Sequence, residues 1–167
     1  MSSVAAVSGI GLKNGTEALR ELPDDLINVQ PAQTTYIYAN DGETLLTAFY
    51  SEHRRYVPIT EMSAYVQQAI MASEDQRFYH HNGVDAKGIA RAFIANSQSG
   101  EVEQGASTLT MQYVRMALRD RATTPAEVRA ATEQTPARKL REAQLAVEVK
   151  KKLSKTKILK QYLNHTY

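Results

Sequence analysis

The sequence predicts a mainly α-helical domain that is preceded by a short β-hairpin. Apolar residues recur at spacings of three and four over most of residues 60–163, which is the period of an amphipathic helix. Strand-forming residues are confined to two short runs on either side of an Asp-Gly pair. With 167 residues, 43% of them apolar, the chain fits one globular domain or a piece of one, and we do not expect two independent domains.

Residues 1–33 show weak periodicity and hold several glycines and prolines, so we expect a linker or the remnant of a membrane anchor. The apolar run at residues 4–12 is shorter than the roughly 20 residues that cross a bilayer. No anchor or export signal is visible in the chain. The absence of cysteine excludes disulfides, thiolate zinc sites and a cysteine nucleophile.

Residues 34–58 are expected to form the hairpin and a lead-in to the helical part. The β-prone runs are residues 34–39 and 44–50. Between them lies Asn40-Asp41-Gly42, and an Asp-Gly pair tolerates the positive φ of a tight turn.

The helical part is expected to contain five helices. They are, in chain order, a first from Thr60 or Ser63 to Ser73, a second after Asp85 that fades near residues 97–100, a third from Ser107, a fourth from Pro136 to about Leu153, and a fifth after Ser154. Hydroxyl and carboxylate side chains suit helix starts because they accept hydrogen bonds from free N–H groups. We expect residues 100–105 to be a loop and the polar stretch at residues 120–136 to be mobile.

The charge of the chain is unevenly distributed. The formal net charge is only +2, but basic residues greatly outnumber acidic ones over residues 136–160. Such a region attracts phosphates or an anionic membrane surface, although a solvated helix face explains it equally simply. Motifs for binding nucleic acid are missing, so no nucleic-acid partner is expected.

The densest group of reactive side chains lies at residues 74–83, where two acids precede two histidines at the end of the first helix. Three interpretations remain open. A carboxylate here could act as a general base. Asp75, His80 and His81 could instead hold a metal ion. Hydrogen bonds between Asp75 and His81 could also simply complete the helix end.

Two further segments could bind anions. Residues 105–112 run from a loop into a helix with clustered hydroxyls, which suits either a phosphate or ordinary capping by Ser107 or Thr108. Arg138, Lys139 and Glu142 fall on the fourth helix, where Arg138 and Glu142 share a face. They form either an anion site or a surface ion pair.

Taken together, these segments resemble the glycosyltransferase family 51 domain, the peptidoglycan transglycosylase module of class A penicillin-binding proteins. Residues 74–83 match the family pattern E-D-x-x-F-x-x-H-x-G, and residues 105–112 match G-x-S-T-x-T-x-Q. Residues 138–142 match R-K-x-x-E, and residues 155–164 match K-x-x-I-L-x-x-Y-L-N. The hairpin and the lead-in at residues 56–59 also look like the corresponding segment of actinobacterial members.

The resemblance implies a lysozyme-like lobe that polymerises lipid II with inversion and releases undecaprenyl pyrophosphate. It implies that Glu74 is the base and that Asp75 supports it. Glu142 would be the second carboxylate, near the leaving pyrophosphate or a divalent ion such as magnesium or manganese. The implied substrate-binding residues are Asp75, Ser107, Thr108, Gln112, Arg115, Arg138, Lys139 and Lys155. The implied structural residues are Phe78, His81 and Gly83.

The same resemblance implies partners and a location. The partners would be lipid II, the growing glycan chain and the membrane surface, at the extracytoplasmic face of the bacterial cytoplasmic membrane. Residues 59–167 would be the N-terminal part of the domain, with its remainder and a transpeptidase domain in the parent protein. Ala106, Met111, Arg115 and Met116 depart from the usual family residues.

Two other functions stay open at this point. A lysozyme-like hydrolase would also use paired carboxylates, but it would cleave a preformed glycan. A fragment without catalytic activity could hold a lipid pyrophosphate through its basic helices.

Overall fold

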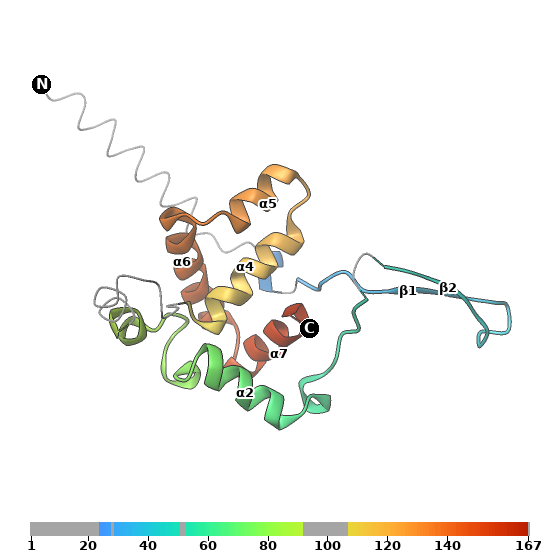
Figure 1. Ribbon diagram of the computed structural model, residues 1–167, viewed down its shortest axis with the longest axis horizontal. Helices are drawn as coiled ribbons and strands as arrows, with labels where there is room; N and C mark the ends of the chain where they lie inside the picture. The colour runs from blue at the N-terminus through green and yellow to red at the C-terminus, as the bar shows by residue number, and fades with distance from the viewer. Residues whose placement is uncertain (1–23, 28, 51–52, 92–106, 167) are drawn as a thin grey trace, which may run out of the picture.

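The computed structural model describes residues 24–27, 29–50, 53–91 and 107–166 of the chain. Its helices gather into one cluster, and a two-stranded ribbon extends from this cluster to one side (Figure 1). The expectation of a mainly helical fold with a preceding hairpin is therefore confirmed. Within the described ranges, the structure holds no helix with the length and apolar character needed to cross a membrane.

The hairpin consists of β1 (Thr35–Tyr38) and β2 (Leu45–Phe49), which pair antiparallel. Gly42 in the turn has a φ of 73°, a conformation that glycine adopts without strain. The Asp41 carboxylate accepts hydrogen bonds from the N–H groups two and three residues later, at 3.0 and 2.9 Å. Almost every strand residue is exposed, so the turn and the backbone ladder define this element rather than a core.

Helix α2 (Ala64–Glu74) follows the short 3-10 helix η2 (Ile59–Glu61). The Ser63 hydroxyl caps α2, as the sequence predicts, by accepting a hydrogen bond from the Tyr65 N–H. No residue of α2 is buried. Ile70 and Met71 nevertheless pack half-buried against the core, and the C-terminal end of the helix bears on the candidate site.

A second helix begins directly after Asp85, again at the predicted place. Residues 86–91 are helical, and the Ile89 N–H donates to the Asp85 carbonyl at 2.9 Å. The expected end of this helix and the expected loop at residues 100–105 lie outside the described residues.

Three helices enclose the core: α4 (Leu109–Arg121), α6 (Pro136–Lys152) and α7 (Lys155–Thr166). Helix α4 packs against both of the others (Figure 1). Most of the buried apolar side chains come from these three helices, among them Leu109, Tyr113, Val114, Leu145, Val149, Ile158 and Leu159, and Phe78 and Leu26 join them from outside. The site described below is built on this rigid group of helices.

All three core helices begin at a capping hydroxyl. The side chains of Thr108, Thr135 and Ser154 each accept a hydrogen bond from the N–H three residues later, at 3.2 Å in every case. Pro136 occupies the first turn of α6, where its missing N–H costs nothing. The predicted starts of the third, fourth and fifth helices therefore agree with the structure.

The expectation of a mobile stretch at residues 120–136 is wrong. This stretch contains a helix, α5 (Pro125–Thr132), of which only Ala131 is buried. A capping box between Thr124 and Glu127 and a proline in the first turn stabilise the helix locally. The helix is short and its apolar residues are mostly alanines, so the end signals are the clearer indication of it.

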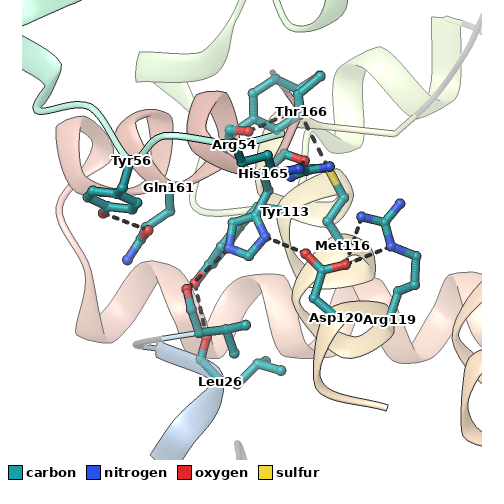
Figure 2. A network of polar contacts seen from close by, with 12 residues as sticks. Leu26, Arg54, Tyr56, Tyr113, Met116, Arg119, Asp120, Gln161, His165 and Thr166 are labelled. Atoms are coloured by element: carbon teal, nitrogen blue, oxygen red, sulfur yellow. Dashed lines mark hydrogen bonds and ion pairs between the residues drawn. The ribbon is translucent and has the colours of Figure 1, made fainter. Parts of the chain in front are cut away.

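Part of the expected N-terminal linker is folded against the helices. The short helix η1 (Asp24–Ile27) places the fully buried Leu26 in the core. The Leu26 carbonyl accepts a hydrogen bond from the Tyr113 hydroxyl at 3.0 Å (Figure 2). Residues 24–27 therefore belong to the domain, whereas residues 1–23 lie outside the described part.

His165 connects this N-terminal segment to α4 and α7 (Figure 2). Its Nδ1 lies 2.8 Å from an oxygen of Asp120, and its Nε2 lies 3.2 Å from the Val29 carbonyl oxygen. Each of the two ring nitrogens therefore faces an oxygen that accepts hydrogen bonds. Arg119 donates to the other oxygen of Asp120 at 2.7 Å. One carboxylate thus organises two nitrogen donors.

This network predicts a dependence of stability on acid pH. Burial by itself raises the pKa of Asp120, but the hydrogen bonds from His165 and Arg119 and their positive charge outweigh it and lower the pKa below its ordinary 3.8. The stabilisation is therefore present above about pH 4 and is lost as the pH falls through the lowered value. We expect Asp120→Asn to reduce the free energy of unfolding at pH 6 by about 1–2 kcal/mol.

Urea unfolding between pH 2 and 6 measures this effect. The free energy of unfolding should depend less steeply on pH in Asp120→Asn than in the unmodified chain. A suitable control is Glu148→Gln, which breaks the exposed ion pair of Glu148 with Lys151 and should cost little. Equal pH dependence in Asp120→Asn and the unmodified chain would contradict the prediction.

Candidate active site

Glu74 is the last residue of α2, and its side chain is exposed. One carboxylate oxygen accepts a hydrogen bond from the Gln112 side-chain amide at 2.9 Å. The carbonyl oxygen of that same amide accepts a hydrogen bond from the Tyr162 hydroxyl at 3.1 Å. These contacts join α2, α4 and α7 at the position where the sequence predicts a base.

Asp75, the next residue, is buried and ends α2. Its two oxygens lie 3.0 and 2.9 Å from Nε2 of His81, and one of them also accepts the Leu109 N–H at 3.1 Å. Leu109 is the first residue of α4, so the carboxylate faces the positive end of the helix dipole. Asp75 thus fixes the segment that carries Glu74 against the start of α4.

Thr108 and Gly83 form a second tie between the same segments. The Thr108 hydroxyl donates to the Gly83 carbonyl while it caps α4, so both of its hydrogen-bonding functions are used. Gly83 has a φ of 93° and lies against α6, where an added Cβ would overlap the Ala146 carbonyl. The structure therefore gives Thr108 a structural position, although the family resemblance implies substrate contact.

Phe78, which belongs to residues 74–83, is in contact with Lys155, the first residue of α7. Phe78 is buried, and Nζ of Lys155 lies 4.2 Å from the centre of its ring. Burial lowers the pKa of Lys155 to about 8, an effect that the charge of Asp75 opposes and that of Lys150 reinforces. Among the described residues, no hydrogen-bond partner meets this nitrogen.

Glu142 lies in the interior of the fold and bridges two arginines. Its side chain is 1% exposed, and one oxygen accepts a hydrogen bond from Nε of Arg115 at 2.9 Å. The same oxygen is paired with Arg138, one helical turn earlier on α6. The ion pair that the sequence suggests thus exists, but it is buried and contains a second arginine from α4.

The remaining predicted site residues lie in less enclosed positions. Ser107 is half-buried just before the cap of α4, and Lys139 is exposed on α6. His80, the third member of the suggested metal site, is also exposed, whereas Asp75 and His81 pair with each other.

The described residues do not fit a divalent cation at Glu142. No group of three or more histidine, aspartate or glutamate side chains suitable for a metal occurs in the described part of the chain. In addition, the Glu142 carboxylate is flanked by two guanidinium groups, whose positive charge opposes a bound cation. We therefore derive no chemical step through a metal.

Helix α4 relates the two carboxylates to each other. Gln112, which contacts Glu74, and Arg115, which contacts Glu142, are three residues apart on α4 and so lie on neighbouring turns of one face. Helix α4 therefore carries Gln112, the partner of the exposed Glu74, next to Arg115, a partner of the buried Glu142.

Tyr162 and Asn164 are further residues near the site that were not among the predicted site residues. Tyr162 contacts Gln112, while Asn164 exchanges hydrogen bonds with the Val57 backbone at 2.7 and 3.0 Å and so holds the lead-in segment. Both belong to the fourth matched motif, which was the available signal. A helical period places Tyr162 on the apolar face but gives no partner for its hydroxyl.

The fold and site define a helical domain in which one helix, α4, carries the hydrogen-bond partner of an exposed acid and an arginine paired with a buried one. Residues 41–167 of the chain match the model of the protein family described as transglycosylase. The chain belongs to this transglycosylase family. The resemblance that the four motifs indicate is confirmed.

The chain is similar to penicillin-binding proteins. It is 38% identical to "Penicillin-binding protein 1A" of Neisseria gonorrhoeae over 145 residues, which are 86% of the chain and 16% of the relative. It is 36% identical to "Penicillin-binding protein 2D" of Bacillus subtilis over 140 residues, which are 84% of the chain and 19% of the relative. The chain thus spans less than a fifth of the length of these relatives. These matches lend no support to the expected likeness to actinobacterial members.

The close approach of Gly83 to α6 predicts a strong effect of substitution. We expect Gly83→Ala to reduce the free energy of unfolding by about 2–4 kcal/mol, because it combines a strained φ with overlap against a backbone carbonyl. Gly42→Ala is the matched control, since Gly42 also has a positive φ but has open space around it, and should cost about 1 kcal/mol. Urea unfolding of both variants measures the difference, and equal costs would contradict the prediction.

The lowered pKa of Lys155 predicts a titration near pH 8, which the 13Cε chemical shift of labelled lysine should report. The signal can be assigned by its loss in Lys155→Met. Because an unfolded lysine keeps its proton to about pH 10.5, the unfolded state binds more protons between pH 8 and 10.5. This group should therefore make the chain more stable as the pH rises through that window. A midpoint near 10.5 would contradict the prediction.

Proposed function

We propose that this chain carries the reactive groups of a peptidoglycan glycosyltransferase that joins lipid II units into glycan strands. The observation that carries the proposal is the exposed carboxylate of Glu74, which α4 holds through Gln112. The same helix carries Arg115 on the neighbouring turn. A transfer that removes a proton from an alcohol and releases an anion needs a base and a cation, which the Glu74 carboxylate and Arg115 can supply.

In the proposed reaction, the 4-hydroxyl of one disaccharide unit attacks the anomeric carbon of the growing chain. Glu74 accepts the hydroxyl proton while the new carbon–oxygen bond forms. The bond to undecaprenyl pyrophosphate breaks on the opposite face of the sugar, so the configuration is inverted. The leaving group keeps the bonding electrons and departs as a diphosphate anion.

The positive groups of the site suit this leaving group. Arg115 and Arg138 converge on one oxygen of Glu142, which fixes their guanidinium groups before any substrate binds. Lys155, whose pKa is about 8, would be held fully charged by a nearby diphosphate, because an anion favours the protonated form. Charges that are oriented in advance can lower a barrier by several kcal/mol.

The lipid carrier places the proposed reaction at a membrane surface, on the extracytoplasmic face where glycan strands are assembled. The end of α6 and the start of α7 carry lysines that would attract anionic lipid. These residues are Lys150, Lys151, Lys152 and Lys157. Lipid II and the growing glycan are the proposed partners.

Glu74→Gln tests the assignment of the base. We expect polymerisation of labelled lipid II to fall at least about 100-fold, because a general base contributes a factor of this order or more. The melting temperature should stay unchanged, since Glu74 is exposed. Glu61→Gln, which replaces an exposed acid on η2, is the matched control and should keep full activity.

Glu142→Gln separates the roles of the two acids. It should lower the melting temperature as well as activity, because it leaves two guanidinium groups without their buried partner.

Undiminished polymerisation by Glu74→Gln would overturn the assignment of the base. Cleavage of a preformed glycan without polymerisation would instead identify a hydrolase.

A further inference from the structure

Glu74 is an exposed residue at the end of a helix in which no residue is fully buried. A side chain in such a position samples several rotamers unless another group holds it. The Gln112 amide supplies that hold from α4, a helix of the core. The position of the Glu74 carboxylate therefore depends on how firmly Gln112 is itself held.

Gln112 is bound at both ends of its planar amide. Its nitrogen donates to Glu74 at 2.9 Å, and its oxygen accepts from the Tyr162 hydroxyl at 3.1 Å. These two bonds fix the rotation of the amide about its last torsion angle, which is otherwise broad. A reversed amide would turn an oxygen toward the Glu74 carboxylate, and two acceptors would then repel each other.

Tyr162 is well suited to hold the amide. Tyr162 is only 4% exposed and belongs to the part of the core that α7 contributes, together with Ile158, Leu159 and Leu163. The aromatic ring therefore has little freedom to move, and its hydroxyl presents a donor at a fixed place. A chain of two hydrogen bonds thus connects the rigid core to the exposed acid.

We propose that Tyr162 is a positioning residue for the transfer reaction and that it acts on Glu74 through Gln112. The proposal rests on the proposed function, in which Glu74 is the base. Loss of the hydroxyl leaves the ring packing in place but frees one end of the amide. The Glu74 carboxylate then spends less time in the reactive position, so kcat falls while KM changes little.

Tyr162→Phe is the test, and the protein offers a matched control. The Tyr56 hydroxyl donates to the side-chain oxygen of Gln161 at 3.0 Å, so Tyr56→Phe breaks the same kind of bond at the residue next to Tyr162 on α7 (Figure 2). We expect Tyr162→Phe to lower kcat for lipid II polymerisation by roughly tenfold. Tyr56→Phe should change kcat by less than about twofold, and both variants should melt within a few degrees of the unmodified protein.

A double-mutant cycle shows whether Tyr162 acts through Gln112. In a Gln112→Ala background the amide is absent, so adding Tyr162→Phe should lower kcat by less than about twofold. A full tenfold loss in that background would mean that Tyr162 acts by another route, and it would overturn the proposal.

The side-chain amide signals of Gln112 give a readout that does not depend on turnover. They are assigned in nitrogen-15 NMR spectra by their loss in Gln112→Ala. Tyr162→Phe should shift them, and Tyr56→Phe should not. Unchanged Gln112 signals in Tyr162→Phe would overturn the proposal.

The activity measurements keep the two proposals apart. If Glu74→Gln is inactive while Tyr162→Phe matches Tyr56→Phe, the positioning role is wrong and the base assignment stands. If Glu74→Gln keeps full activity, the base assignment is wrong, and the positioning role that rests on it falls as well.

Discussion

The buried carboxylate of Asp75 is the constraint on which the candidate site depends. It accepts the first N–H of α4 and pairs with His81, so it satisfies a helix end that would otherwise leave a donor without a partner. This contact joins the end of α2 to the start of α4, although 34 residues separate Asp75 from Leu109 in the sequence. Glu74 is the adjacent residue, and its location relative to α4 follows from this junction.

Glu142 imposes a second constraint, which concerns charge. Burying a carboxylate is costly unless positive groups compensate it, and here two arginines from different helices provide the compensation. The same two ion pairs orient both guanidinium groups. The two acids lie in different environments: Glu74 is exposed, whereas Glu142 is enclosed and pairs with two arginines.

The sequence predicted the parts of this fold that local chemistry determines. The Asp-Gly turn predicted the hairpin, and capping residues such as Thr108 and Ser154 predicted helix starts, because these signals act within a few residues. Helix α5 was missed because it is only eight residues long and its apolar residues are mostly alanines. For the candidate site, the motifs supplied the residue types but not their directions. Lys155 lies over Phe78, and Tyr162 contacts Gln112. Both contacts depend on the packing of segments that are far apart in the chain.

The exposed ribbon of β1 and β2 has a consequence for how the molecule opens. Two strands without a covering layer are only marginally stable in water, and apolar residues such as Leu46 and Phe49 remain exposed here, at 63% and 61%. Separation of the strands therefore needs no disruption of the helical core. Backbone amides of the ribbon should exchange with solvent deuterium through local fluctuations, whereas those of α4 exchange only when the whole domain unfolds. The chain thus combines two regions with very different opening free energies.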